Sequence, residues 1–229
     1  MRIWDIHPGY LNPQSLLGEH RELHGLVSII VHHKKGYSHH PETIRWLEYG
    51  WAIKQRHREL SCEMQLRGYD DRSPVKTRSN KGVWPSNYID KPHVQFQLLQ
   101  EKYKEKKAGR IPLPGNEQEL WSHHKYSVLA RDQAKYKEIG RRVGAREVSF
   151  ENLALELVEM LRVPPSRGGI RNALQHMWGY VSEVHPETDH NIESCSLKKL
   201  CTLIRKNAQE INEPYLMHST ALSELMVWL

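Results

Sequence analysis

The chain is short of cysteine and of long apolar runs, and each shortage excludes a class of protein. Its 229 residues include three cysteines, Cys62, Cys195 and Cys201, with no CxxC spacing. An odd, scattered set argues against a disulfide framework or a zinc site and fits a reducing compartment. There is no run of 18 apolar residues and no signal peptide. We therefore expect a cytoplasmic protein with no membrane partner.

Strand signals are scarce as well. Only two residues are phenylalanine, and apolar and polar residues hardly ever alternate, whereas helical spacing recurs along the chain. The sequence predicts an all-α fold, with Gly68 stopping one helix. Pro112, Pro114 and Gly115 punctuate the chain and predict two domains, 1–113 and 117–229. The predicted helices span residues 15–31, 41–67, 94–107, 117–140, 148–162, 169–184, 196–211 and 218–228.

Basic residues outnumber acidic ones, which favours a polyanionic partner over an acidic one. The formal net charge is +6, and eight of the 15 histidines fall within residues 1–82. A basic loop at residues 32–40 holds several of these charges. The loop could contact phosphates, which would make binding strongly salt-dependent; it could also be a solvated loop or a histidine metal site. The candidate phosphate-binding residues in it are Lys34, Lys35, His39 and His40.

A free chain terminus and a helical carboxylate are both found within the first 24 residues. Residues 15–31 have the spacing of an amphipathic helix, with Glu22 on the face opposite the apolar stripe and between Gly18 and Gly25. The stripe consists of Leu16, His20, Leu23, Val27 and Ile30, with Leu17, His24 and Val31 beside it. Two glycines in a helix interior suggest that the N-terminal segment or a ligand approaches this face. An α-amine titrates near ~7.7–8.0, so part of it is unprotonated at neutral pH. An amine beside a carboxylate suits imine formation on a sugar.

Residues 15–24 resemble the pyrimidine-dimer DNA glycosylases of the endonuclease V type. The resemblance continues at residues 58–60, 62–63 and 66–69, and more weakly towards residue 112. In that family the N-terminal amine attacks the sugar C1′ and a first-helix glutamate assists. The resemblance therefore implies that Met1 is the nucleophile and that Glu22 assists it. Removal of the initiator methionine normally requires a small second residue, and Arg2 is large, so we expect Met1 to be retained. No metal or cofactor is needed for this chemistry.

The same resemblance implies damaged double-stranded DNA as the partner. Arg2 and Arg21 align with family arginines that hold DNA, and we include His24 in the predicted nucleic-acid-binding set. Two positions depart from the family pattern, because Ser15 replaces a histidine and Gly25 replaces an arginine. These departures leave the amine–glutamate chemistry in place but leave dimer recognition, and hence the lesion, open.

The second half of the chain resembles the YbgA-like domain, which is found alone or fused to bacterial thiouracil desulfidases. The matching segments are residues 120–126, 165–169 and 172–176. The resemblance implies contact with modified RNA or a nucleobase. The turn at residues 164–169 precedes a helix, so it could bind an anion through backbone N–H groups, Arg167 and Arg171. It could equally be an ordinary capped turn.

The sequence thus predicts a DNA-repair enzyme, a DNA glycosylase with AP-lyase activity on damaged pyrimidines. Two alternatives remain open. One is a non-catalytic nucleic-acid-binding module, and the other is a partner of modified-nucleobase metabolism of the thiouracil type. The oligomeric state and the role of residues 117–229 are not predicted.

Overall fold

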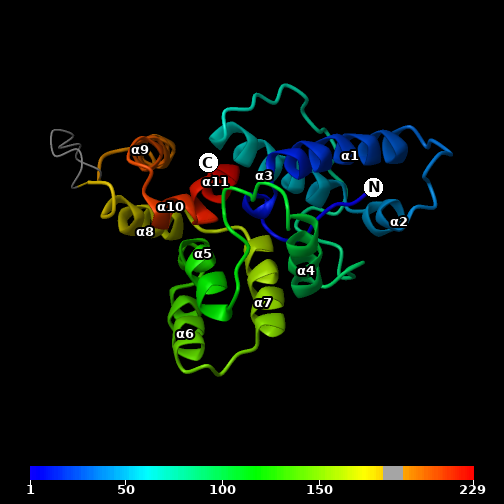
Figure 1. Ribbon diagram of the computed structural model, residues 1–229. Coiled ribbons are helices and arrows are strands. Elements are labelled where there is room, and N and C mark those ends of the chain that lie inside the picture. The colour runs from blue at the N-terminus through cyan, green and yellow to red at the C-terminus, as the bar shows by residue number, and fades with distance from the viewer. Residues whose placement is uncertain (183–192) are drawn as a thin grey trace. The chain divides into compact units, whose positions relative to one another are not determined.

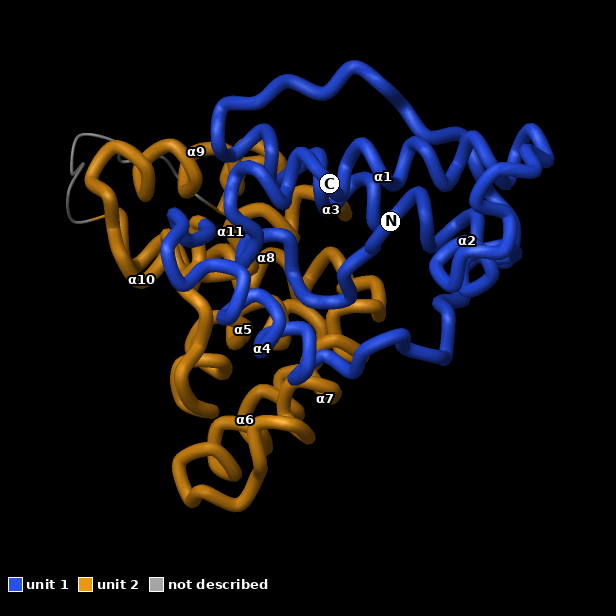
Figure 2. Tube along the Cα trace, turned by 45° about the vertical axis from the view of Figure 1, so that its right-hand side comes forward, with its two compact units in different colours: residues 1–109 blue, residues 110–229 orange. Residues whose placement is uncertain are grey.

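The computed structural model describes residues 1–182 and 193–229, and every regular element in these ranges is a helix (Figure 1). The predicted all-α fold is therefore confirmed. The chain divides into two compact units, Met1–Gly109 and Arg110–Leu229 (Figure 2). Within the described ranges, no helix is long and apolar enough to cross a bilayer.

Unit 1 is built around α1, which packs against α3. Asn12 caps α1 by accepting a hydrogen bond from the Ser15 amide, and Pro13 occupies the first turn, where no N–H is needed. The apolar side of α1 contributes Leu16, Leu23 and Leu26 to the core. The helical elements of the unit are η1 (Pro8–Tyr10), α1 (Pro13–Val31), α2 (Pro41–Trp46), α3 (Gly50–Leu66) and α4 (Pro92–Lys102).

The helix predicted over residues 41–67 is two helices, α2 and α3, and the prediction of one helix is wrong. Gly50 starts α3 against a distant segment, because its amide donates to Ser79 Oγ at 2.9 Å and the Trp51 amide donates to the Ser79 carbonyl. A Cβ on Gly50 would lie 2.6 Å from Ser79 Oγ. Residue 79 thus satisfies the first amides of α3 and requires a glycine there. Gly68 follows α3 with a φ of +81°, as expected of a helix stop.

Unit 2 contains more and shorter helices than predicted. The span 117–140 breaks into α5 and α6, because Asp132 caps a new helix by accepting from the Ala134 and Lys135 amides. The span 169–184 ends early at Trp178, and its last two residues lie outside the described residues. The elements are α5 (Glu117–Leu129), α6 (Gln133–Gly144), α7 (Phe150–Arg162), α8 (Arg167–Trp178), α9 (Leu197–Glu210), α10 (Pro214–Met217), α11 (Ala221–Glu224) and η2 (Leu225–Trp228).

Two adjacent buried histidines on α5 should make unit 2 sensitive to acid. Burial lowers the pKa of His124 to about 4, and burial together with neighbouring basic groups lowers the pKa of His123 to about 3. Both titrate near ~6.5 when unfolded, so the unfolded chain binds more protons and stability falls as pH drops below that value. Between pH 7 and pH 5 we expect a loss of about 2 kcal/mol for each histidine.

Urea unfolding at the two pH values measures this effect. His124→Gln should reduce the pH-dependent loss, whereas the exposed His176→Gln should leave it unchanged. An equal loss in the wild type and in His124→Gln would show that His124 is not the titrating group.

Candidate active site

Residues 2–6 are held in place through their backbone amides. Each amide from residue 2 to residue 6 donates to a carboxylate or amide side chain, and the acceptors come from three helices. This arrangement fixes the path of the chain next to its terminus. The pairs are Arg2 with Glu22 (2.6 Å), Ile3 with Glu42 (3.0 Å), Trp4 with Glu19 (3.2 Å), and Asp5 and Ile6 with Gln95 (2.8 and 3.3 Å).

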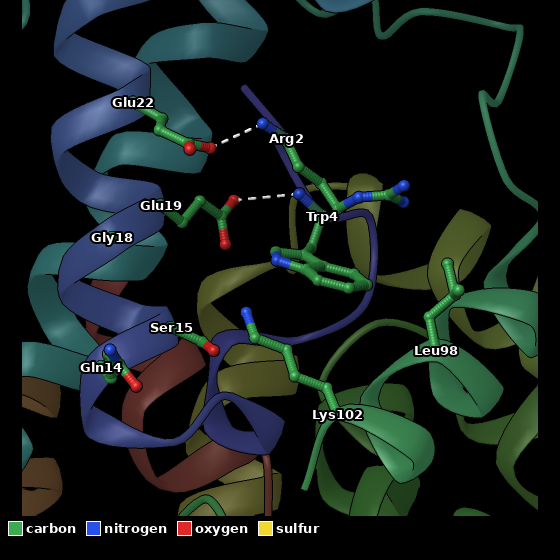
Figure 3. Close-up of a pocket in the computed structure, with 9 residues that line it drawn as sticks. All are labelled: Arg2, Trp4, Gln14, Ser15, Gly18, Glu19, Glu22, Leu98 and Lys102. Carbon is green, nitrogen blue, oxygen red and sulfur yellow. Dashed lines mark hydrogen bonds between the residues drawn. The ribbon is translucent and has the colours of Figure 1, made fainter.

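A cleft of about 330 Å³ lies beside this segment (Figure 3). One side is a single face of α1, since Ser15, Gly18, Glu19 and Glu22 follow helical spacing. Figure 3 shows Leu98 and Lys102 of α4 on the side away from α1. The nine lining residues are Arg2, Trp4, Gln14, Ser15, Gly18, Glu19, Glu22, Leu98 and Lys102.

Glu22 lies next to the chain terminus. Its Oε2 accepts the Arg2 amide at 2.6 Å, and its side chain is half-buried at the cleft. Met1 is the residue directly before Arg2, and consecutive Cα atoms are only ~3.8 Å apart. The structure thus brings Glu22 into contact with Arg2, the residue that follows the terminal Met1.

Glu19 is a cleft residue that the sequence reasoning missed. It is buried and forms a two-pronged ion pair with Arg56, with distances of 2.8 and 2.9 Å, while its Oε1 also accepts the Trp4 amide. Burial raises the pKa of Glu19 to about 7, although the Arg56 guanidinium acts to lower it. The available signal was its position three residues before Glu22, which puts both carboxylates on one helix face.

The predicted apolar stripe of α1 is therefore partly wrong. Glu19 and Leu26 are buried on the core side, whereas Val31, placed next to the stripe, is 50% exposed. Apart from the neighbouring backbone of α1 itself, no described atom lies within 4 Å of a Cβ built on Gly18 or on Gly25. The N-terminal segment thus does not account for these glycines, and at Gly18 the missing side chain leaves the cleft open.

The two N-terminal arginines lie in different places. Arg2 lines the cleft, stacks over the Trp4 ring at 5.0 Å and pairs with Asp90 at 2.5 Å. Arg21 is exposed, and its Nε donates to the Leu17 carbonyl. Arg21 is not among the residues that line the cleft, so any contact that it makes with DNA lies outside it.

The basic loop at residues 32–40 is also outside the cleft lining. Lys34, Lys35 and His39 are exposed, with Lys34 Nζ donating to Ser28 Oγ at 2.7 Å. His40 instead caps α2, because its Nδ1 accepts the Glu42 amide at 3.1 Å. The cap stabilises the start of α2, the helix whose Glu42 accepts the Ile3 amide. His40 therefore has a structural role.

His24 does not face the cleft. Its Nε2 lies 3.2 Å from His57 Nε2, and burial lowers the pKa of His24. His20 and Asp71 complete a cluster with these two histidines. The prediction that His24 contacts DNA has no support from this position.

The turn before α8 in unit 2 has the features of an ordinary cap. Ser166 Oγ accepts the Gly169 amide at 3.0 Å, and a Cβ on Gly169 would lie 2.0 Å from the Ala130 carbonyl oxygen. Packing and capping therefore account for Ser166 and Gly169. Arg171 donates to the Cys195 carbonyl at 2.9 Å, while Arg167 is exposed.

Comparison with known proteins supports both resemblances. The family model described as pyrimidine dimer DNA glycosylase matches residues 1–77. This span contains α1 and the three glutamates, Glu19, Glu22 and Glu42, that accept amides of the N-terminal segment. A model described as a protein of unknown function (DUF1722), which is YbgA-like, matches residues 125–225. No curated protein and no solved structure matches the chain. The chain thus joins a segment similar to pyrimidine dimer DNA glycosylases to a YbgA-like segment.

Proposed function

We propose that this protein is a DNA glycosylase with AP-lyase activity on damaged pyrimidines. The observation that carries the proposal is the Glu22 carboxylate, which binds the Arg2 amide one residue from the α-amine. Glu22 and Arg2 line a cleft, and both lie within the segment similar to pyrimidine dimer DNA glycosylases. A cleft of this size falls at the lower end of the ~300–1,000 Å³ typical of ligand pockets and suits an extruded nucleotide.

The chemistry starts at the unprotonated α-amine of Met1, which attacks C1′ of the damaged nucleotide. The bond from C1′ to the base breaks, and the base leaves with a proton from the amine. The C1′–O4′ bond then breaks, O4′ takes a proton, and the nitrogen remains joined to C1′ of the opened sugar as a protonated imine. Glu22 stabilises the cationic imine and takes a proton from C2′. The C3′–O bond then breaks by β-elimination, and water hydrolyses the imine to free the amine.

Binding of the duplex relies on basic side chains around the site. Arg2 at the cleft, together with the exposed Arg21, Lys34, Lys35 and His39, would contact phosphates. Counterion release makes such contacts weaken steeply with salt. A lesion that already distorts the duplex lowers the cost of extruding a base into the cleft.

We place this chemistry in residues 1–113 and a nucleic-acid or nucleobase contact, centred on Arg167, in residues 117–229. The alternative functions are a non-catalytic nucleic-acid-binding module and a partner of modified-nucleobase metabolism. Neither alternative forms a covalent bond to DNA, so the presence of an imine separates them from the glycosylase.

Borohydride trapping on a duplex with one abasic site tests the proposal. The full-length protein should form a covalent adduct that shifts on a denaturing gel and maps by mass spectrometry to the N-terminal peptide. A tetrahydrofuran abasic analogue, which has no aldehyde at C1′, should give no adduct. If protein that binds the duplex yields no adduct, the binding-module alternative replaces the enzyme.

A further inference from the structure

Three histidines and one aspartate in unit 1 converge outside the candidate active site. His20 and His24 lie one turn apart on α1, His57 comes from α3, and Asp71 from the segment after α3. One ligand atom from each lies within 4.8 Å of all the others. Residues four apart on a helix share a face, so α1 presents two imidazoles to the same point.

We propose that His20, His24, His57 and Asp71 bind one divalent transition metal ion, of which Zn²⁺ best fits the donors. Imidazole nitrogen and carboxylate oxygen are ordinary zinc ligands, and three nitrogens with one oxygen fill a tetrahedral site. The site is separate from the amine–glutamate pair and does not depend on the proposed glycosylase function.

Three of the distances between donor atoms are close to the edges of a tetrahedron. Metal–nitrogen bonds of ~2.0–2.1 Å give tetrahedral edges of about 3.3–3.4 Å. His57 Nε2 lies 3.2 Å from His24 Nε2 and 3.3 Å from Asp71 Oδ2, and His20 Nε2 lies 3.3 Å from Asp71 Oδ1. The two Asp71 distances involve different carboxylate oxygens, and the four ligand atoms lie within 4.8 Å of one another, so the longer edges must shorten when an ion binds.

Hydrogen bonds alone leave the cluster poorly satisfied. His24 and His57 present two Nε2 atoms to each other, and one shared proton is the most that can join them. The buried His20 Nε2 makes no hydrogen bond of acceptable geometry among the described residues, although Asp71 Oδ1 lies 3.3 Å away.

The fourth ligand is held in position by its own partners. Ser61 Oγ donates to Asp71 Oδ2 at 2.6 Å, and the Ser73 amide donates to Oδ1 at 2.9 Å. Such outer contacts orient ligands in metal sites. A cleft of about 380 Å³, lined by His57, Ser61 and Asp71 among others, gives an ion a path from solvent.

A metal here would tie three separate segments together. It would join α1, which carries Glu19 and Glu22, to α3 and to residues 67–91, where the structure has no helix. With four protein ligands the coordination is closed, as in structural rather than catalytic zinc sites. The consequence for the protein is a fixed α1 and a more stable unit 1.

Metal titration of the full-length protein tests this site. Protein stripped with a chelator should bind one equivalent of Zn²⁺ by calorimetry, and Co²⁺ should give the intense visible absorption of tetrahedral coordination. Zinc should also raise the melting temperature. Less than a fifth of an equivalent bound, or a weak octahedral Co²⁺ spectrum, would overturn the proposal without touching the amine–glutamate chemistry.

Ligand variants locate the ion. His57→Gln and Asp71→Asn should each weaken Zn²⁺ binding by at least ~100-fold, beyond the ~10–100-fold typical of losing an outer contact. The exposed His32→Gln is the matched control and should bind as the wild type does. Circular dichroism of the metal-free variants checks the fold. If His57→Gln unfolds, the test relies on Asp71→Asn, whose replacement side chain has the same size. Binding unchanged in a folded ligand variant would place the ion elsewhere and overturn the assignment.

Discussion

Blocking the α-amine of Met1 should abolish cleavage and borohydride trapping of abasic DNA while leaving DNA binding intact. An acetylated or extended terminus has no basic amine next to Glu22, and an amide nitrogen does not form an imine. Binding should persist because most of the proposed phosphate contacts, Arg21 and the basic loop, are distant in sequence from the terminus. The measurement compares adduct yield with affinity for the same duplex, after mass spectrometry has confirmed the state of the terminus.

Lys102 provides the control for this experiment, because its side-chain amine lines the cleft. If the α-amine of Met1 is the nucleophile, removal of the Lys102 amine leaves the imine-forming group in place. Lys102→Gln should therefore keep trapping activity. Full trapping by a verified, intact N-terminal extension, or its loss in Lys102→Gln, would move the nucleophile away from Met1.

The helices were predictable from the sequence, but their breaks were not. Helical spacing and the lack of strand alternation indicate an all-α chain, and Gly68 acts as the expected stop. The break before Gly50 depends on Ser79, which satisfies the first amides of α3 from 29 residues away. A local pattern contains no information about such a partner, so the sequence predicts one continuous helix.

The candidate active site was also predictable only in part. Glu22 was found because it lies on a polar helix face near the terminus and within a family resemblance. Glu19 was missed because a buried carboxylate needs a partner, and that partner, Arg56, lies 37 residues away on another helix. The cluster of His20, His24, His57 and Asp71 was missed for the same reason, since only the packing of α1 on α3 assembles it.

Glu22→Gln should lower glycosylase turnover by at least ~10²-fold, the lower range for a positioned acid–base group. The amide is isosteric and its oxygen can still accept the Arg2 N–H, so the path of the N-terminal segment should hold. What is lost is the negative charge that stabilises the cationic imine and accepts the C2′ proton. A 10²-fold loss corresponds to about 2.7 kcal/mol of transition-state stabilisation.

The matched control is Glu48→Gln, which removes the same charge from an exposed position between α2 and α3. Both variants gain one unit of net positive charge, so a general effect on DNA affinity appears equally in each. Single-turnover cleavage on saturating substrate separates chemistry from binding, and a melting curve reports the fold. A loss below threefold in Glu22→Gln, with melting unchanged, would make Glu22 a residue that holds the terminus rather than one that acts on the sugar. A ≥10²-fold loss confined to Glu22→Gln requires its charge in the chemical step, because the hydrogen bond that positions the terminus is retained.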